Sequence, residues 1–134
     1  MFVLIPIPVK RRWFSLDREF VALADRETML KAAKQVFDEL GLRIHKQTSS
    51  EMVHWRRGFG RATPIVAAMV NELEEYYRLN FRSLGTPSLT SLRIQVQMPF
   101  SIWPGSKQRA EERIRRFMDK LDKVSAEHGI RYKE

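Results

Sequence analysis

The sequence predicts an α+β fold, a two-layer sandwich in which two or three helices pack on one face of an antiparallel sheet of four or five strands. Apolar residues recur at helical spacing over residues 26–40 and 106–128, and they alternate with polar residues over 76–82 and 92–98. A length of 134 residues fits a single domain, 1–134, that buries a core without disulfides, which the absence of cysteine excludes.

The chain begins with an apolar run that prolines interrupt. Pro6 and Pro8 exclude a central strand, so we expect residues 1–18 to form an extended N-terminal arm or an edge strand. The run at 1–9 is too short to cross a bilayer, and its basic residues follow it rather than precede it, so it is neither a membrane helix nor a signal peptide. We therefore expect a cytoplasmic protein that does not insert into membranes.

The first regular elements are a strand and a helix. Residues 19–24 (EFVALA) predict a core strand, and Asp25 then occupies the N-cap position of a helix over 26–40. Gly41 suits the left-handed conformation that ends a helix, and the apolar Leu42 can fold back onto the last turn. The helix therefore leads directly into the next element.

Residues 42–57 predict a hairpin of two short strands joined by a turn at 49–50. The opposed pairs in this register are Lys46 and Val53, Gln47 and Met52, His45 and His54, Ile44 and Trp55, and Arg43 and Arg56. One face, expected to be packed, carries Leu42, Ile44, Val53 and Trp55, and the other, expected to be open, carries Arg43, His45, Gln47, His54 and Arg56. Opposed cations repel, so the open face predicts a surface that binds an anion.

Residues 63–75 allow two interpretations. Pro64 at the first helical position favours a helix, whereas the β-branched residues and the acidic end of the segment favour the alternative, a long strand. We expect the acidic residues Glu72, Glu74 and Glu75 to form the solvated end of a helix.

A second hairpin and a final helix carry further basic residues. The polar positions of 76–82 and 92–98 are expected on the same open face as those of the first hairpin, and they include Arg78, Asn80, Arg82, Arg93, Gln95 and Gln97. On the helix over 106–128, a rotation of about 100° per residue gathers the basic residues into one arc beside the apolar stripe. This arc contains Arg109, Arg113, Arg116, Lys120 and Lys123.

The sequence contains no motif for catalysis or for a cofactor. It lacks the G-x-S-x-G, P-loop, H-E-x-x-H and G-x-G-x-x-G patterns, so we expect a protein that is not an enzyme and that uses no cofactor. His45 and His54 would form only half of a zinc shell, without a carboxylate or cysteine at a companion spacing, so we expect no metal site.

The net charge of +8 favours a polyanionic partner. We therefore predict a small, basic, non-enzymatic protein that binds nucleic acid or another polyanion through the open sheet face and the last helix, with Phe59 stacking on a base. The predicted contacts are Arg43, His45, His54, Arg56, Phe59, Arg78, Arg82, Arg93, Arg109, Arg113, Arg116 and Lys120. This prediction depends on the polar sides of both hairpins facing the same way.

A structural or protein-interaction module with no nucleic-acid role is the alternative. The apolar arm would lie in water unless it packs on its own domain or on a second copy, which would give a homodimer through residues 1–14. Salt distinguishes the two functions, because phosphate binding weakens as ionic strength rises whereas apolar association does not.

Overall fold

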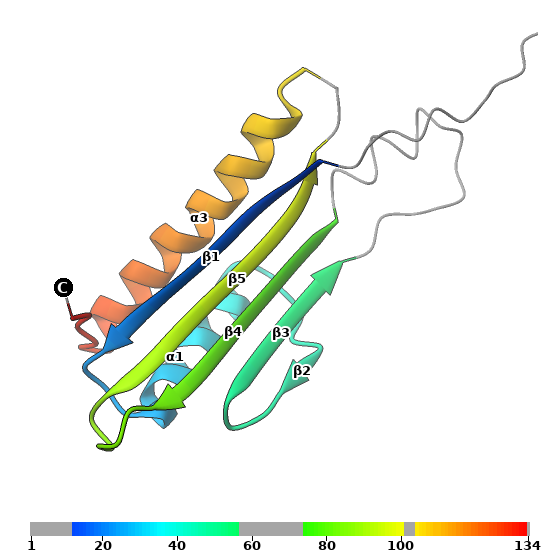
Figure 1. Cartoon of the computed structure of the whole chain (residues 1–134). Coiled ribbons are helices and arrows are strands. Elements are labelled where there is room, and N and C mark those ends of the chain that lie inside the picture. Colours follow the sequence, from blue (N-terminus) through cyan, green and yellow to red (C-terminus); the bar gives the residue numbers. More distant parts are fainter. Residues whose placement is uncertain (1–11, 57–73, 101–103, 134) are drawn as a thin grey trace, which may run out of the picture.

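The computed structural model describes residues 12–56, 74–100 and 104–133, which form one five-stranded antiparallel sheet and two helices (Figure 1). The elements are β1 (Arg12–Ala22), α1 (Arg26–Glu39), β2 (Lys46–Gln47), β3 (Glu51–Arg56), β4 (Glu75–Ser83), β5 (Thr90–Phe100) and α3 (Ser106–Glu127). The strand order is β1-β5-β4-β3-β2. The predicted α+β class and antiparallel sheet are therefore confirmed, and the sheet has the larger of the two expected numbers of strands.

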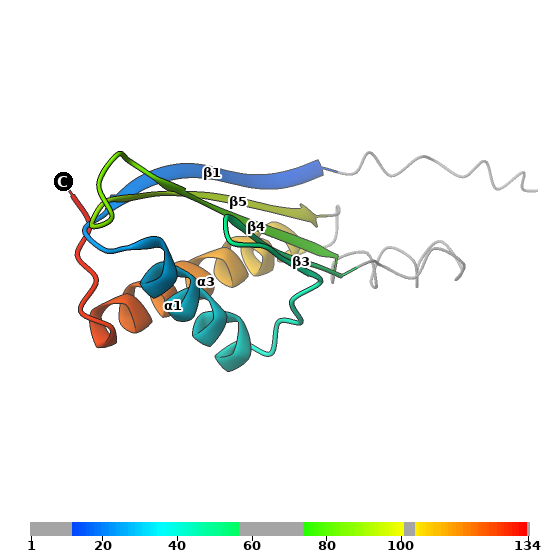
Figure 2. The ribbon, with the colours of Figure 1, turned by 90° about the horizontal axis from the view of Figure 1, so that it is seen from below.

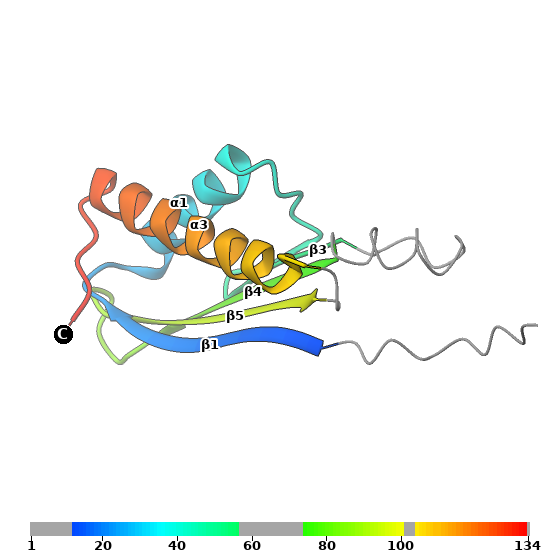
Figure 3. The ribbon, with the colours of Figure 1, turned by 90° about the horizontal axis from the view of Figure 1, so that it is seen from above.

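Both helices lie on the same side of the sheet (Figures 2 and 3). The Asp25 side chain caps α1 by accepting a hydrogen bond from the backbone N–H of Thr28 at 2.9 Å. Gly41 takes a φ of 69°, and the backbone N–H of Leu42 donates to the carbonyl of Phe37 at 2.8 Å. The predicted cap and stop of this helix are thus confirmed.

The core lies between the helices and the sheet face that they cover. Alternate residues of β4 and β5 are buried there, as the sequence predicted: Tyr77, Leu79, Phe81, Leu92, Ile94, Val96 and Met98. At the centre the Phe117 ring of α3 lies 6.0 Å from the Phe37 ring of α1 and 4.8 Å from the Tyr77 ring of β4, measured between centroids. These contacts join both helices to the sheet.

The edge strand β1 begins earlier than predicted. It pairs with β5 along its whole length, from Arg12 opposite Phe100 to Ala22 opposite Thr90, so it includes part of the predicted arm 1–18. The alternation of apolar and polar residues along β1 is hard to recognise in the sequence, because Arg18 lies on the same side as the apolar positions. The sheet edge gives Arg18 access to solvent there. Residues 1–11 lie outside the described residues.

The predicted helix over 63–75 also lies largely outside the described residues. Its last position, Glu75, is instead the first residue of β4. Neither of the two described helices is long and apolar enough to cross a membrane.

The first hairpin has the predicted register next to its turn but the opposite orientation. Lys46 lies opposite Val53 and Gln47 opposite Met52, as expected, whereas the predicted strand does not extend to residues 43–45, which precede β2. The pairing of β3 with β4, however, places Met52, His54 and Arg56 on the helix-covered face and Val53 and Trp55 on the other face, hereafter the open face. The predicted assignment of His54, Arg56, Val53 and Trp55 to faces was therefore wrong.

The physical reason for this orientation is that both sets of alternating residues in β3 contain apolar side chains. Met52 is fully buried opposite Leu79 and belongs to the main core. Period two then forces His54 onto the same face as Met52. His54 is tolerated there because it finds polar partners at the end of the sheet, as described below.

We expect Phe117→Ala to lower the free energy of unfolding by about 3–5 kcal/mol, because it leaves a cavity between the two helices and the sheet. Urea unfolding followed by circular dichroism measures this loss. The exposed Lys107 of the same helix provides a control, since Lys107→Ala should change stability by less than about 0.5 kcal/mol. Equal effects of the two substitutions would contradict the central position of Phe117.

Candidate functional site

The open face of the sheet is not the purely basic surface that the sequence predicted. The edge strand β1 places Asp17 beside Arg93, whose Nη2 lies 2.9 Å from the Asp17 carboxylate. Similar pairs on this face are Arg78 with Glu51 at 3.1 Å, Lys46 with Glu51 at 3.3 Å, and Arg82 with Glu19 at 4.0 Å. The acids of β1 and β3 therefore offset much of the positive charge of this face.

A buried charge cluster lies on the opposite, helix-covered face, where β3 ends and β4 begins. Its centre is the carboxylate of Glu75, whose residue is only 5% exposed. The Glu75 Oε1 accepts a hydrogen bond from His54 Nε2 at 2.9 Å and lies 3.6 Å from Arg56 Nη2. Its Oε2 accepts a hydrogen bond from Arg113 of α3. Three cationic or basic side chains from two elements therefore share one carboxylate.

Both ring nitrogens of His54 face hydrogen-bond acceptors. Nδ1 lies 2.6 Å from the carbonyl oxygen of Arg43, and Nε2 lies against the Glu75 carboxylate. Whichever ring nitrogen carries a proton, an acceptor therefore lies within hydrogen-bond distance of it. His45 Nδ1 approaches the same Arg43 carbonyl at 3.0 Å, and the His45 ring stacks on Trp55 with a centroid distance of 4.2 Å.

The neighbouring charges determine the ionisation of this cluster. Burial acts to raise the pKa of Glu75, but the hydrogen bond from His54 and the charge of Arg113 outweigh it and lower the pKa below its ordinary value. Burial, followed by the negative charge of Glu75, raises the pKa of the Tyr77 hydroxyl. The phenol thus stays protonated beside the Glu75 carboxylate.

A cavity of about 200 Å³ opens beside this cluster. The described residues that line it are Leu40, Leu42, Arg56, Glu75, Tyr77, Arg113 and Arg116. We call this cavity the arginine pocket. Three guanidinium groups face one carboxylate in its wall, so its net charge is positive.

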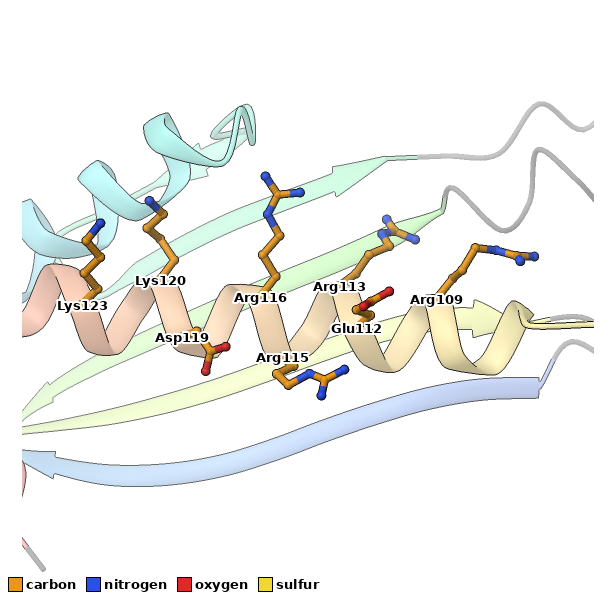
Figure 4. A pocket seen from close by; sticks show the side chains of 8 residues that line it. All are labelled: Arg109, Glu112, Arg113, Arg115, Arg116, Asp119, Lys120 and Lys123. Atoms are coloured by element: carbon orange, nitrogen blue, oxygen red, sulfur yellow. The ribbon is translucent and has the colours of Figure 1, made fainter.

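A second, larger hollow of about 790 Å³ follows the surface of α3. Its described lining residues are Arg109, Glu112, Arg113, Arg115, Arg116, Asp119, Lys120 and Lys123. Figure 4 shows five of these cations projecting from the same side of the helix. We call them the basic row: Arg109, Arg113, Arg116, Lys120 and Lys123. The predicted arc of cations on this helix is thus confirmed.

The basic row and the arginine pocket are continuous. Arg113 and Arg116 line both. Lys120 lies 3.9 Å from Glu39 of α1, whereas Arg116 and Lys123 form no ion pair with any residue in the part of the chain that the structure describes. Cationic groups are therefore available at the junction of the two hollows and at the far end of the row.

The structure separates the predicted contacts instead of gathering them on one surface. Arg56 lines the arginine pocket with residues of the last helix, and His54 lies behind it, bonded to the Glu75 carboxylate. Arg43 and His45 lie in the segment that leads into β2. On the open face, away from the pocket, lie Arg78, Arg82 and Arg93. Phe59 is outside the described residues. The expectation that both hairpins turn their polar sides the same way was therefore wrong.

Sequence reasoning missed the residue at the centre of the cluster. Glu75 was predicted to be a solvated helix end, yet it is buried in β4. The signal was present, because the alternation of Tyr77, Leu79 and Phe81 continues back to position 75 on the same face. Met52 gave a second signal, since its alternation with His54 places both on one face.

No model of a known protein family matches this sequence, and no curated protein matches it either.

The lowered pKa of Glu75 makes stability depend on pH. The free energy that the ionised carboxylate contributes is present above the ordinary pKa of 4.5 and is lost as the pH falls through the lower pKa of the folded state. We expect Glu75→Gln to cost about 3–5 kcal/mol at neutral pH, because it removes the buried carboxylate from its ion pair with Arg113, and to flatten the acid limb of the stability curve. Urea unfolding at a series of pH values measures both effects.

The exposed Asp119 of α3 serves as the control for this measurement, since Asp119→Asn should leave the acid limb unchanged. An acid limb that stays as steep in Glu75→Gln as in the wild type would show that other carboxylates dominate the pH dependence.

Proposed function

We propose that the protein is a non-enzymatic nucleic-acid-binding protein whose contact surface is the basic row of α3 together with the arginine pocket. The observation that carries the proposal is the segregation of cations on one side of α3, with Arg116 and Lys123 unpaired among the described residues. Arginine and lysine in such a row neutralise successive phosphates and release their counterions. The proposed class of protein is the one that the sequence predicted, but the main contact surface is α3 instead of the sheet.

The dimensions of the basic row suit a nucleic-acid backbone. From Arg109 to Lys123 the helix rises by about 21 Å at about 1.5 Å per residue. One strand of a duplex carries one phosphate about every 3.4 Å along its axis, so the row is as long as about six nucleotides of one strand. Contacts of this kind position a strand without reading its bases.

The open face is a weaker candidate because its cations already have partners. Arg78 and Arg93 form short ion pairs with Glu51 and Asp17. A phosphate would have to compete with these carboxylates and would be repelled by them. The contacts predicted for residues of this face remain predictions, and this face is the weaker of the two candidate surfaces.

The surroundings of Glu75 support a binding role instead of catalysis. A general base needs a free lone pair within reach of a substrate proton. Both oxygens of this carboxylate already face donors, from His54 on one side and Arg113 on the other. The carboxylate is therefore better suited to orient the surrounding cations than to accept a proton.

A charge-neutralising pair in the basic row tests this proposal. We expect Arg116→Gln/Lys123→Gln to weaken the binding of labelled single-stranded RNA or DNA at low salt. Fluorescence anisotropy at several salt concentrations should show the slope of log K against log salt falling by about 1.4 for single strands, about 0.7 for each lost phosphate contact.

The matched control is Arg78→Gln/Arg93→Gln, which removes the same charge from the open face. We expect this control to bind almost as tightly as the wild type. If it loses more affinity than the helix pair, the open face is the contact surface, and absence of binding by the wild type at low salt would refute the proposal.

A homodimer is a second candidate function, and the position of β1 favours it. This strand of 11 residues is at the edge of the sheet, and no described strand pairs with its outer side. A long free edge is a template for pairing with another chain.

Sedimentation velocity over a range of protein concentrations tests the second candidate. A dimer formed through β1 should persist at high salt, since strand pairing and apolar contacts are screened little. A monomer at every concentration would exclude it.

A further inference from the structure

We infer that the arginine pocket binds a dianionic phosphate group, either free phosphate or the phosphomonoester of a nucleotide or of a nucleic-acid strand end. Only the strand-end form of this inference rests on the proposed function. The pocket lies where the end of β3, the start of β4 and α3 meet, next to the basic row.

The charge of the pocket suits a dianion. Its described lining contains the guanidinium groups of Arg56, Arg113 and Arg116 and the single carboxylate of Glu75. That carboxylate is already engaged by His54 and Arg113, so it offers little to a cationic ligand. A phosphomonoester carries a charge of about −1.5 to −2 at pH 7 and three acceptor oxygens.

Hydrogen-bond donors remain available for such a ligand. The Nη2 of Arg56 lies 3.6 Å from Glu75, beyond ordinary hydrogen-bond distance, and its side chain is 49% exposed. Arg116 forms no ion pair within the described residues. Each guanidinium presents a planar fork that can bind two phosphate oxygens at once.

Glu75 has a positioning role in this arrangement. Its hydrogen bond to Arg113 holds that guanidinium at the wall of the pocket, and the hydrogen bond with His54 holds the carboxylate itself in place. The cations are thereby fixed before a ligand enters, which reduces the entropy cost of binding.

The size of the pocket distinguishes a terminal phosphate from an internal one. A cavity of about 200 Å³ is smaller than the range of about 300–1,000 Å³ that drug-sized ligands occupy. An internal phosphodiester has a substituent on both sides and a single charge, so it suits the open basic row. Because Arg113 and Arg116 line both hollows, a strand along the row can place its terminal phosphate in the pocket.

The test compares labelled single strands of one sequence that carry a 5′-phosphate, a 3′-phosphate or only hydroxyl ends. Inorganic phosphate and a nucleoside monophosphate are added separately, with the melting temperature as the readout. The variants are Arg56→Gln, which changes the pocket but not the row, and Lys123→Gln, which changes the row but not the pocket.

We expect the wild type and Lys123→Gln to bind one of the phosphorylated strands about tenfold more tightly than the hydroxyl strand, as one charged hydrogen bond would give. The preference should vanish in Arg56→Gln, so that this variant binds the phosphorylated and the hydroxyl strands with equal affinity. Free phosphate should raise the melting temperature of the wild type and not that of Arg56→Gln. If Arg56→Gln does not fold, Arg56→Lys, which keeps the charge but loses the fork, takes its place.

The outcomes separate this inference from the proposed function. Equal affinity for all strand ends, together with no response to free phosphate, overturns the inference while salt-sensitive strand binding still supports the function. A phosphate preference that survives in Arg56→Gln also overturns it. Stabilisation by phosphate that depends on Arg56, with no strand binding at low salt, supports the pocket and refutes the nucleic-acid function.

Discussion

A carboxylate that is only 5% exposed needs cationic partners, because the free energy cost of burying an isolated charge is several kcal/mol. Glu75 meets this requirement with His54 from β3 and Arg113 from α3. The pairing fixes α3 against the end of the sheet and turns the guanidinium of Arg113 toward the arginine pocket. One electrostatic requirement thus links the packing of the helix to the shape and charge of the candidate site.

Charge is also distributed unequally between the two faces of the sheet. On the open face, Arg78 and Arg93 have acids beside them at 3.1 and 2.9 Å. On the helix-covered side, a single carboxylate is shared by several cations, and the basic row continues the positive surface along α3. A ligand with several phosphates would therefore meet arginine and lysine side chains without ion-pair partners among the described residues on the helix side, whereas on the open face it would have to displace existing ion pairs.

The parts of the structure that depend on local patterns were predictable from the sequence. The cap at Asp25, the stop at Gly41 and the cations along α3 follow from helical spacing and were confirmed. The orientation of the first hairpin was not predictable in this way, because Met52 and Val53 give both faces of β3 an apolar residue, and pairing with β4 decides between them. The acids of β1 were missed for a related reason, since only the register with β5 places them beside arginines.

The most direct test of the functional surface is an NMR titration of the full chain with a single-stranded oligonucleotide, observed through the side-chain Nε–H signals of the arginines. These signals report on each face of the sheet separately. We expect the signals of Arg56, Arg113 and Arg116 to shift on binding and those of Arg78 and Arg93 to stay in place. Shifts confined to Arg78 and Arg93 would contradict the assignment and place the contact surface on the open face.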